Sequence, residues 1–374
     1  MTPPRCHTLD PKNGTTPISA EEIVRRLENP GSSSPRPERK KIIIFTDIGR
    51  HIDDATLLVL ITYLHKIQVV EVLLIVANVT PTERRAKAAK FICENMGVPD
   101  VRVATGSNGT DRSIELHSHE FSGVESIQGT IEERHKIIEI LEALRKKEEQ
   151  CAMIGAWAEH QEDPNILQPS AKAQNNSYDN EATNRVYSWL SQNRITTYTA
   201  TRVPAIQAAV PAEVLKQPAA RGHPVAKYIA EAFEKQEYRV YTQSAEPDPH
   251  DRYMEHMDLK WYAERATRYV EAFPNKEPES FEEIRPYLDM TLYDPVAGLI
   301  CALSGHPFFN QVFQPHGKQI SLGPQEKTKV VHYIIGRSGD KANNVEDVPD
   351  VNPKLLRDVM ELLIRKALEQ TMPE

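Results

Sequence analysis

Cysteine is scarce in this sequence, with four residues in 374, and no two of them are spaced as Cys-x-x-Cys. Neither a zinc ribbon nor a dense disulfide framework is therefore indicated. The first residues, MTPPRCHTLD, also lack an apolar run behind a basic start, so we expect no secretory signal. Together these features predict a protein of a reducing compartment, most simply the cytoplasm.

Long hydrophobic runs and an excess of positive charge are missing as well. The most apolar stretch, residues 55–79, contains His65, Lys66, Gln68 and Glu71, so it falls short of the roughly 20 apolar residues of a membrane-spanning helix. The 45 Lys and Arg residues face 53 acidic ones, a net charge of −8. No overall field attracts nucleic acid or an anionic membrane, so we expect neither as a partner and favour a small-molecule substrate.

Residues 1–38 are rich in Pro, Ser, Gly and charge, with one short possible helix near 18–27, and we expect a mostly disordered tail. A single α/β domain is predicted for 39–374, because strand-like apolar runs alternate with helical spacing. This alternation predicts a doubly wound, mainly parallel sheet flanked by helices. Strands are expected at 41–45, 69–76, 101–104, 151–154 and 195–199, and helices at 53–64, 82–96, 131–147 and 181–190.

The later part of the chain departs from this alternation. Residues 243–290 are polar, aromatic and interrupted by proline, which predicts a helical insertion, either a lid beside the site or a surface helical hairpin. Residues 352–370 carry apolar side chains at helical spacing and should form a helix packed on the core.

Three aspartates follow the first predicted strand, in the segment FTDIGRHIDDA at residues 45–55. Ligands of open α/β sheets bind outside the carboxyl ends of the strands. Asp47, Asp53 and Asp54 would repel one another unless a cation lay among them, and carboxylate oxygens suit Ca²⁺ or Mg²⁺. The alternative is that Asp53 and Asp54 only stabilise a helix N-terminus. Asp47, fixed by the end of an apolar strand, favours a metal site.

A second acidic segment, TLYDPVA at residues 291–297, places Asp294 before an apolar helix. Alone, it would be an ordinary helix start. Together and in this order, the two segments resemble the inosine/uridine-preferring nucleoside hydrolase family. The resemblance implies a nucleoside hydrolase-like fold, calcium held by Asp47, Asp54 and Asp294, and Asp53 on the ribose hydroxyls.

Weaker matches to the same family lie between these segments. Asn78, after the second strand, and Asn175, in NNSYDNEA, are implied to hydrogen-bond to the sugar, although each could equally be a turn residue. The family also supplies a backbone carbonyl to calcium after the strand at 151–154, which we place at Ala158.

The sequence departs from the family at several positions. Phe45 stands where the family often has another aspartate, and His51 where longer variants tend to carry an acidic residue. Tyr293 stands where many members use histidine to protonate the departing base, and tyrosine, with a pKa of about 10, is the poorer acid near neutrality. His119 in the long loop is a candidate replacement, or a solvated histidine.

The resemblance thus implies a calcium-dependent hydrolase of the N-glycosidic bond of a ribonucleoside or similar riboside. Asp47 would help deprotonate the water, and Tyr293 or His119 would act on the leaving group. One alternative is a related tailoring enzyme that acts on another small molecule, and a second is a non-catalytic ligand-binding relative. A homo-oligomer, dimer or tetramer, is also expected.

Overall fold

The computed structural model describes residues 18–29, 39–49, 51–109, 120–121, 124, 129–132, 136–137, 151–154, 180–192, 195–200, 202–252, 254–313, 316–321, 329–335 and 351–372. Within these residues, no helix is long and apolar enough to cross a membrane. The predicted helix at 131–147 and the long loop that precedes it fall largely outside the described residues.

The first half of the fold is a parallel sheet with helical crossovers, as the alternation predicts. Strands β1 (Lys40–Thr46), β2 (Val70–Ala77) and β3 (Val103–Thr105) pair in that order, all parallel. Helices α2 (Ile52–Lys66) and α3 (Thr82–Asn95) connect them. Because the strands are parallel, their carboxyl ends share one edge of the sheet, and the loops that follow β1 and β2 meet there.

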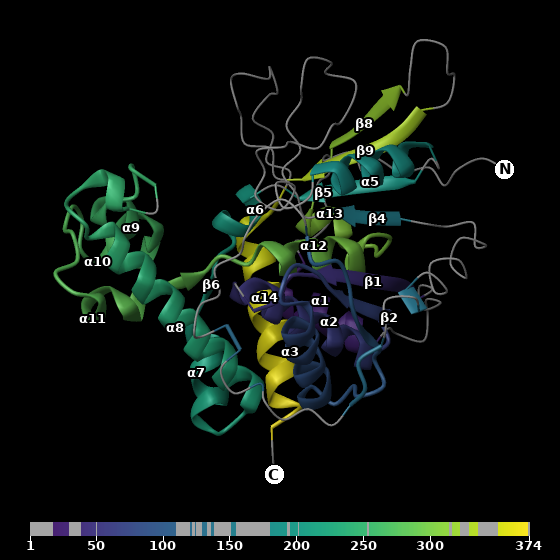
Figure 1. The fold of residues 1–374 in the computed structure, drawn as a ribbon, viewed down its shortest axis with the longest axis horizontal. Helices are drawn as coiled ribbons and strands as arrows, with labels where there is room; N and C mark the ends of the chain where they lie inside the picture. The colour runs from purple at the N-terminus through teal and green to yellow at the C-terminus, as the bar shows by residue number, and fades with distance from the viewer. Residues whose placement is uncertain are drawn as a thin grey trace.

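A second sheet carries the later strands. Its order is β4 (Cys151–Ile154), β5 (Thr196–Ala200), β9 (Lys329–Ile335) and β8 (His316–Ser321). The first three are parallel, and β8 is antiparallel to β9. Helix α5 (Asn180–Gln192) precedes β5. The mainly parallel α/β architecture flanked by helices is confirmed (Figure 1), with seven of the described strands divided between these two sheets and two more forming a separate pair.

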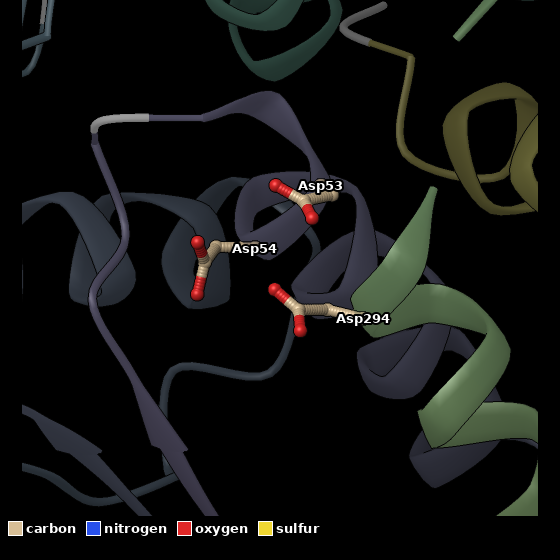
Figure 2. A group of neighbouring side chains, drawn as sticks. All are labelled: Asp53, Asp54 and Asp294. Carbon is tan, nitrogen blue, oxygen red and sulfur yellow. The ribbon is translucent and has the colours of Figure 1, made fainter. Parts of the chain in front are cut away.

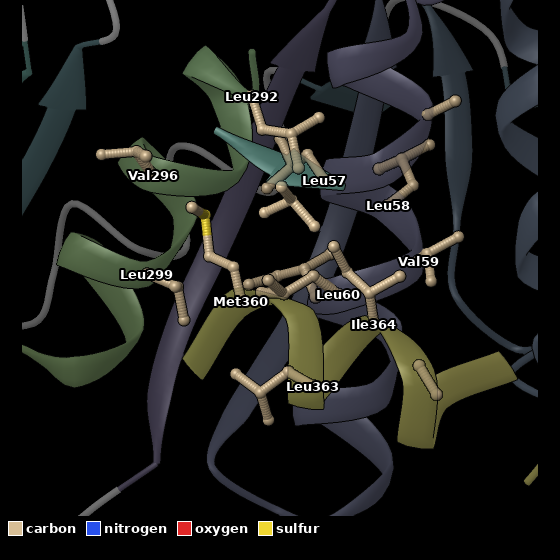
Figure 3. Packing of buried hydrophobic residues seen from close by; sticks show 14 of the residues in the cluster. Leu57, Leu58, Val59, Leu60, Leu292, Val296, Leu299, Met360, Leu363 and Ile364 are labelled. Carbon is tan, nitrogen blue, oxygen red and sulfur yellow. The ribbon is translucent and has the colours of Figure 1, made fainter. Parts of the chain in front are cut away.

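Helix α2 is the centre of the core. Every residue from Ile52 to Leu64 is buried, because α2 packs against the sheet, α3, α12 (Tyr293–Leu303) and α14 (Pro353–Glu369). Figure 3 shows Leu57 and Leu60 of α2 close to Leu292 at the start of α12 and to Met360 of α14. Burying one such aliphatic side chain stabilises the fold by about 1.5–3 kcal/mol. The aspartates at the start of α2 thus stand on a rigid support.

The first described helix belongs to this core. In α1 (Ala20–Glu28), Ile23, Val24 and Leu27 are buried against α14. Glu28 accepts hydrogen bonds from Lys366 Nζ, at 2.7 Å, and from the Tyr63 hydroxyl. The short helix that the sequence indicates near 18–27 is therefore present as α1, and its apolar side chains share one face that packs on the core. The rest of the predicted tail lies outside the described residues.

The helical insertion starts earlier than the composition indicates. Strand β6 (Val210–Pro211) pairs antiparallel with β7 (Asp289–Met290), and this pair closes an excursion over residues 212–288 instead of 243–290. The excursion first contacts α2, α3 and α14 and then, over residues 254–288, forms a helical lobe that extends away from the sheets (Figure 1), with Tyr262 and Tyr269 fully buried inside that lobe. Its helices are α7 (Glu213–Ala220), α8 (Pro224–Ser244), α9 (Leu259–Arg265), α10 (Thr267–Ala272) and α11 (Phe281–Ile284).

The short helices α6 (Arg202–Gln207) and α13 (Phe309–Val312) complete the described elements beside α12 and α14. The predicted C-terminal helix is confirmed as α14, whose first turn is capped by Asn352 Oδ1, an acceptor for the N–H of Leu355 at 3.1 Å.

Candidate metal centre

Three carboxylates meet where α2 and α12 begin. Asp53 and Asp54 lie in the first turn of α2 and Asp294 in the first turn of α12. One oxygen from each lies within 4.8 Å of the others (Figure 2). Asp53 is 9% and Asp54 5% exposed. The two helices pack together, so their packing brings together residues that are far apart in the sequence.

Helix capping does not account for this arrangement. The N-cap residues are His51 for α2 and Leu292 for α12, and neither position makes a side-chain capping bond. The aspartates lie inside the helices. The start of the helix favours the charged form only at Asp53. The N–H groups of Asp53 and Asp54 lower the pKa of the Asp53 carboxyl, but burial raises it by more.

The carboxylates cannot all carry their charge unaided. Burial is the main cause that raises the pKa of all three groups well above the ordinary aspartate value. Mutual repulsion adds to it: Asp54 raises the pKa of Asp53, Asp294 raises that of Asp54, and Asp53 raises that of Asp294. Buried like charges at this separation require protons or a cation.

The donor set fits a hard divalent cation. All three groups offer carboxylate oxygen, and no cysteine or histidine joins this cluster within the described residues. Oxygen donors suit Ca²⁺ and Mg²⁺, and calcium takes about 6–8 of them, so waters or a ligand would complete the shell. The hydroxyl of Thr46 donates a hydrogen bond to Asp54 Oδ1 and so orients one donor from behind.

Asp47 lies at the edge of this cluster. It raises the pKa of all three other aspartates, so its carboxylate is within electrostatic range, but the group within 4.8 Å contains Asp53 in its place. The geometry therefore favours Asp53 over Asp47 as the third carboxylate at a cation, which differs from the assignment that the sequence resemblance implies.

The loop after β1 is shaped by Gly49. Its φ of +116° is a conformation that side chains rarely adopt, and an added Cβ would lie 2.6 Å from the ring of Phe121. Thr46 Oγ1 accepts the N–H of Ile48 at 3.1 Å. These contacts turn the chain sharply between Asp47 and the start of α2.

Two further candidates are described. Asn78 lies beside β1, where its N–H donates to the Thr46 carbonyl at 2.8 Å, while its Oδ1 accepts the N–H of Ser107 at 3.0 Å. The side-chain carbonyl of Asn78 is thus already hydrogen-bonded to a neighbouring loop. Tyr293 is 43% exposed, and burial of the rest of the side chain, followed by the charge of Asp53, raises the pKa of its phenol. His119, Asn175 and Ala158 lie outside the described residues.

Charged residues that the sequence did not single out lie behind the Asp47 loop and near Tyr293. Arg85 of α3 is fully buried behind the Asp47 loop, beside the equally buried Glu120. Arg202 of α6 and Arg265 of α9 act electrostatically on Tyr293, and both oppose the rise of its pKa. One feature of the sequence could have indicated the burial of Arg85. It shares a face of α3 with buried alanines, and a charged residue is unusual on a buried helix face.

Comparison with solved structures identifies the fold. No protein-family model matches the sequence, and no curated protein matches it. The type III effector XopQ in complex with adenosine diphosphate ribose matches with a TM-score of 0.69 and 19% identity, over 93% of this chain and 99% of that chain. This chain shares the fold of that effector.

A second effector shares the fold, and the remaining neighbours are less similar in structure. The effector protein XOO4466 matches with a TM-score of 0.67 and 19% identity, over 93% of this chain and 98% of that one. The neighbours include nucleoside hydrolases, such as the inosine-uridine preferring enzyme from Bacillus anthracis, at a TM-score of 0.46 and 14% identity over 88% of this chain and 100% of that one. At these identities the similarity concerns the fold, and the chemistry has to be argued from the residues of this chain.

Proposed function

We propose that this protein is a calcium-dependent hydrolase of the N-glycosidic bond of a ribonucleoside or similar riboside. The observation that carries the proposal is the convergence of Asp53, Asp54 and Asp294, three mostly buried carboxylates within 4.8 Å, at the carboxyl edge of a parallel sheet. A purely structural role would not require three mutually repelling charges in one place.

In this proposal Asp53, Asp54 and Asp294 hold the cation, and a bound calcium ion would supply Lewis-acid polarisation of a water and of the ribose diol. Asp47, at the edge of the cluster, takes the proton from the attacking water. Asp53 also contacts the sugar hydroxyls, and the side-chain amide nitrogen of Asn78 donates a hydrogen bond to them. The carboxylates stabilise the positive charge that develops on the sugar in an oxocarbenium-like transition state.

Protonation of the leaving group is the weakest step. A tyrosine is already a poor acid near neutral pH, and burial and Asp53 raise the pKa of Tyr293 further. Tyr293 therefore suits a substrate whose leaving group departs without full protonation, and His119 stays a proposal for the acid. This favours an activated riboside over an ordinary nucleoside as the better substrate.

The test is release of free ribose from inosine, uridine and nitrophenyl riboside, with calcium or with a chelator. The parent protein should cleave at least the nitrophenyl compound in a calcium-dependent manner, and Asp294→Asn should abolish the activity. The matched control is Asp258→Asn, because Asp258 caps α9, where its Oδ1 accepts the N–H of Trp261 at 2.8 Å, outside the cluster. Asparagine caps as well as aspartate, so this variant should keep full activity.

A second candidate is favoured by the arginines beside Tyr293. Arg202 and Arg265 provide positive charge near Tyr293, which suits a phosphate-bearing riboside, and adenosine diphosphate ribose is the ligand in the XopQ structure. This candidate is a relative that binds a phosphorylated riboside without hydrolysing it. Calorimetric titration of adenosine diphosphate ribose, with no release of ribose from any compound, would favour it over hydrolysis. Turnover of another riboside or a lactol-like compound would instead indicate a tailoring enzyme.

The cytoplasmic location and the homo-oligomeric state stay predictions of the sequence. Fractionation of tagged protein and light scattering of the purified chain would test them.

A further inference from the structure

The largest fully buried side chain of the described residues is a charged one, Arg85 of α3. A buried arginine is unfavourable unless its donors are satisfied. Arg85 meets this requirement by bonding to backbone carbonyls of two loops, both at the carboxyl edge of the sheet that carries the aspartates.

The guanidinium divides its donors between the loops. Nη1 donates to the carbonyls of Asp47 and Ile48, the latter at 2.7 Å. Nε donates to the Val79 carbonyl at 3.0 Å, and Nη2 to that of Thr80 at 3.4 Å. The planar fork thus ties the loop after β1 to the loop after β2.

A third segment closes over the same loop from the other side. Glu120 Oε2 lies 3.9 Å from Arg85 Nη2, and both side chains are fully buried. The ring of Phe121 lies against Gly49 and 5.9 Å from the Arg85 guanidinium. The hydroxyl of Tyr228 on α8 donates to the Glu120 carbonyl at 2.9 Å, so this segment is itself anchored to a long helix.

We propose that Arg85 is a positioning residue, which together with Phe121 fixes the loop between β1 and α2 and so holds Asp47 beside the carboxylate cluster and Asp53 and Asp54 at the start of α2. The inference rests on the metal site of the proposed function. Arg85 touches the carbonyl of Asp47 and not its carboxylate, so it acts through the backbone. Lysine would keep the charge, but a single ammonium cannot replace a fork that spans two loops.

The test compares Arg85→Lys with Lys90→Met in the full chain. Lys90 is a matched control, because it is a second buried cation on α3, whose Nζ donates to the carbonyls of Pro99, at 2.8 Å, and Val101, away from the aspartates. Both variants should lower the melting temperature. Only Arg85→Lys should weaken calcium binding, by about 10–100-fold as is typical for residues that orient metal ligands, while Lys90→Met should stay within about twofold of the parent. Calcium binding is measured by titration calorimetry.

If Arg85→Lys does not fold, Phe121→Ala tests the same clamp from the opposite side and should also weaken calcium binding. An Arg85→Lys or Phe121→Ala protein that binds calcium like the parent would overturn the inference while leaving the proposed function intact. A parent protein that binds no calcium would overturn the metal site, and the inference with it.

Discussion

Replacement of Asp54 by asparagine separates a metal site from a structural role by the sign of its effect. Asparagine has nearly the same shape and can still accept the hydrogen bond from Thr46. What it removes is one negative charge from the cluster of Asp53, Asp54 and Asp294. A structural aspartate stabilises the protein, so its loss should destabilise. A metal-binding aspartate in a repelling cluster destabilises the metal-free protein, so its loss should stabilise it.

The spacing sets the magnitude. Two charged oxygens 4.8 Å apart repel by about 3.5 kcal/mol at an effective dielectric constant of about 20. Three such pairs amount to about 10 kcal/mol, which is comparable with the whole free energy of unfolding of a domain, about 5–15 kcal/mol. The metal-free cluster must therefore retain protons, as its raised pKa values indicate. Asp54→Asn removes two of the three pairs. Because protonation already relieves most of the repulsion, we expect a gain of about 1–3 kcal/mol instead of the full sum.

The assay is urea unfolding of the parent and Asp54→Asn at about pH 7.5, in chelator and in excess calcium. Calcium at about 100 times its dissociation constant should stabilise the parent by about 2.7 kcal/mol and leave Asp54→Asn unchanged. Asp258→Ala, which removes the cap of α9, should cost about 0.5–2 kcal/mol in both buffers. If Asp54→Asn behaves like Asp258→Ala and keeps the response to calcium, the cluster is structural and the reasoning is refuted.

Three further predictions follow from the same geometry. The folded-state pKa values of the cluster lie above the ordinary value of 3.8, so the stability that these groups contribute without metal is greatest at low pH and is lost as the pH rises through those values. The calcium-induced rise in melting temperature should therefore grow with pH, and thermal unfolding that shows a constant rise would contradict this. Gly49→Ala should destabilise by about 1–3 kcal/mol, because φ is +116° and Phe121 occupies the space of a Cβ; a urea midpoint equal to that of the parent would argue against the loop geometry. Tyr293→His should raise turnover of inosine, by up to about 10²-fold, more than that of nitrophenyl riboside, and an equal effect on both substrates in a ribose-release assay would exclude Tyr293 from the leaving-group side.

The sequence predicted the elements whose apolar pattern is local. Strand β1, helix α2 and strand β2 follow directly from continuous or periodic apolar side chains. Asp294 could be placed with Asp54 only through the family resemblance, which grouped them with Asp47 at the metal and put Asp53 on the ribose. Which aspartate joins the cluster was not predictable. Asp47 lies in the loop after β1 and Asp53 in the first turn of α2, and their separations from Asp294 depend on how α12 packs against α2, which no local pattern shows.

Other features depend on contacts between distant segments. Arg85 reads as one more charge in the run TERRAK, and its role becomes visible only when the loops after β1 and β2 lie around it. The excursion over 212–288 begins where β6 meets β7, a pairing of two residues on each side, which is too short to leave a pattern. Helix α1 was indicated as a short helix within a segment rich in proline and serine, but its burial could not be predicted because it depends on α14.

The packing of α2 against α12 and α14 also fixes when the protein can become functional during its synthesis. Asp53 and Asp54 leave the ribosome early, with a helix whose residues are apolar on nearly every side. Asp294 and α14, the helix that covers α2, are synthesised much later. Until α14 has been synthesised, the nascent chain exposes the apolar surface of α2, which favours chaperone binding. A premature stop between residues 294 and 353 would therefore yield a chain that contains every aspartate of the cluster but lacks the α14 part of the support on which they assemble.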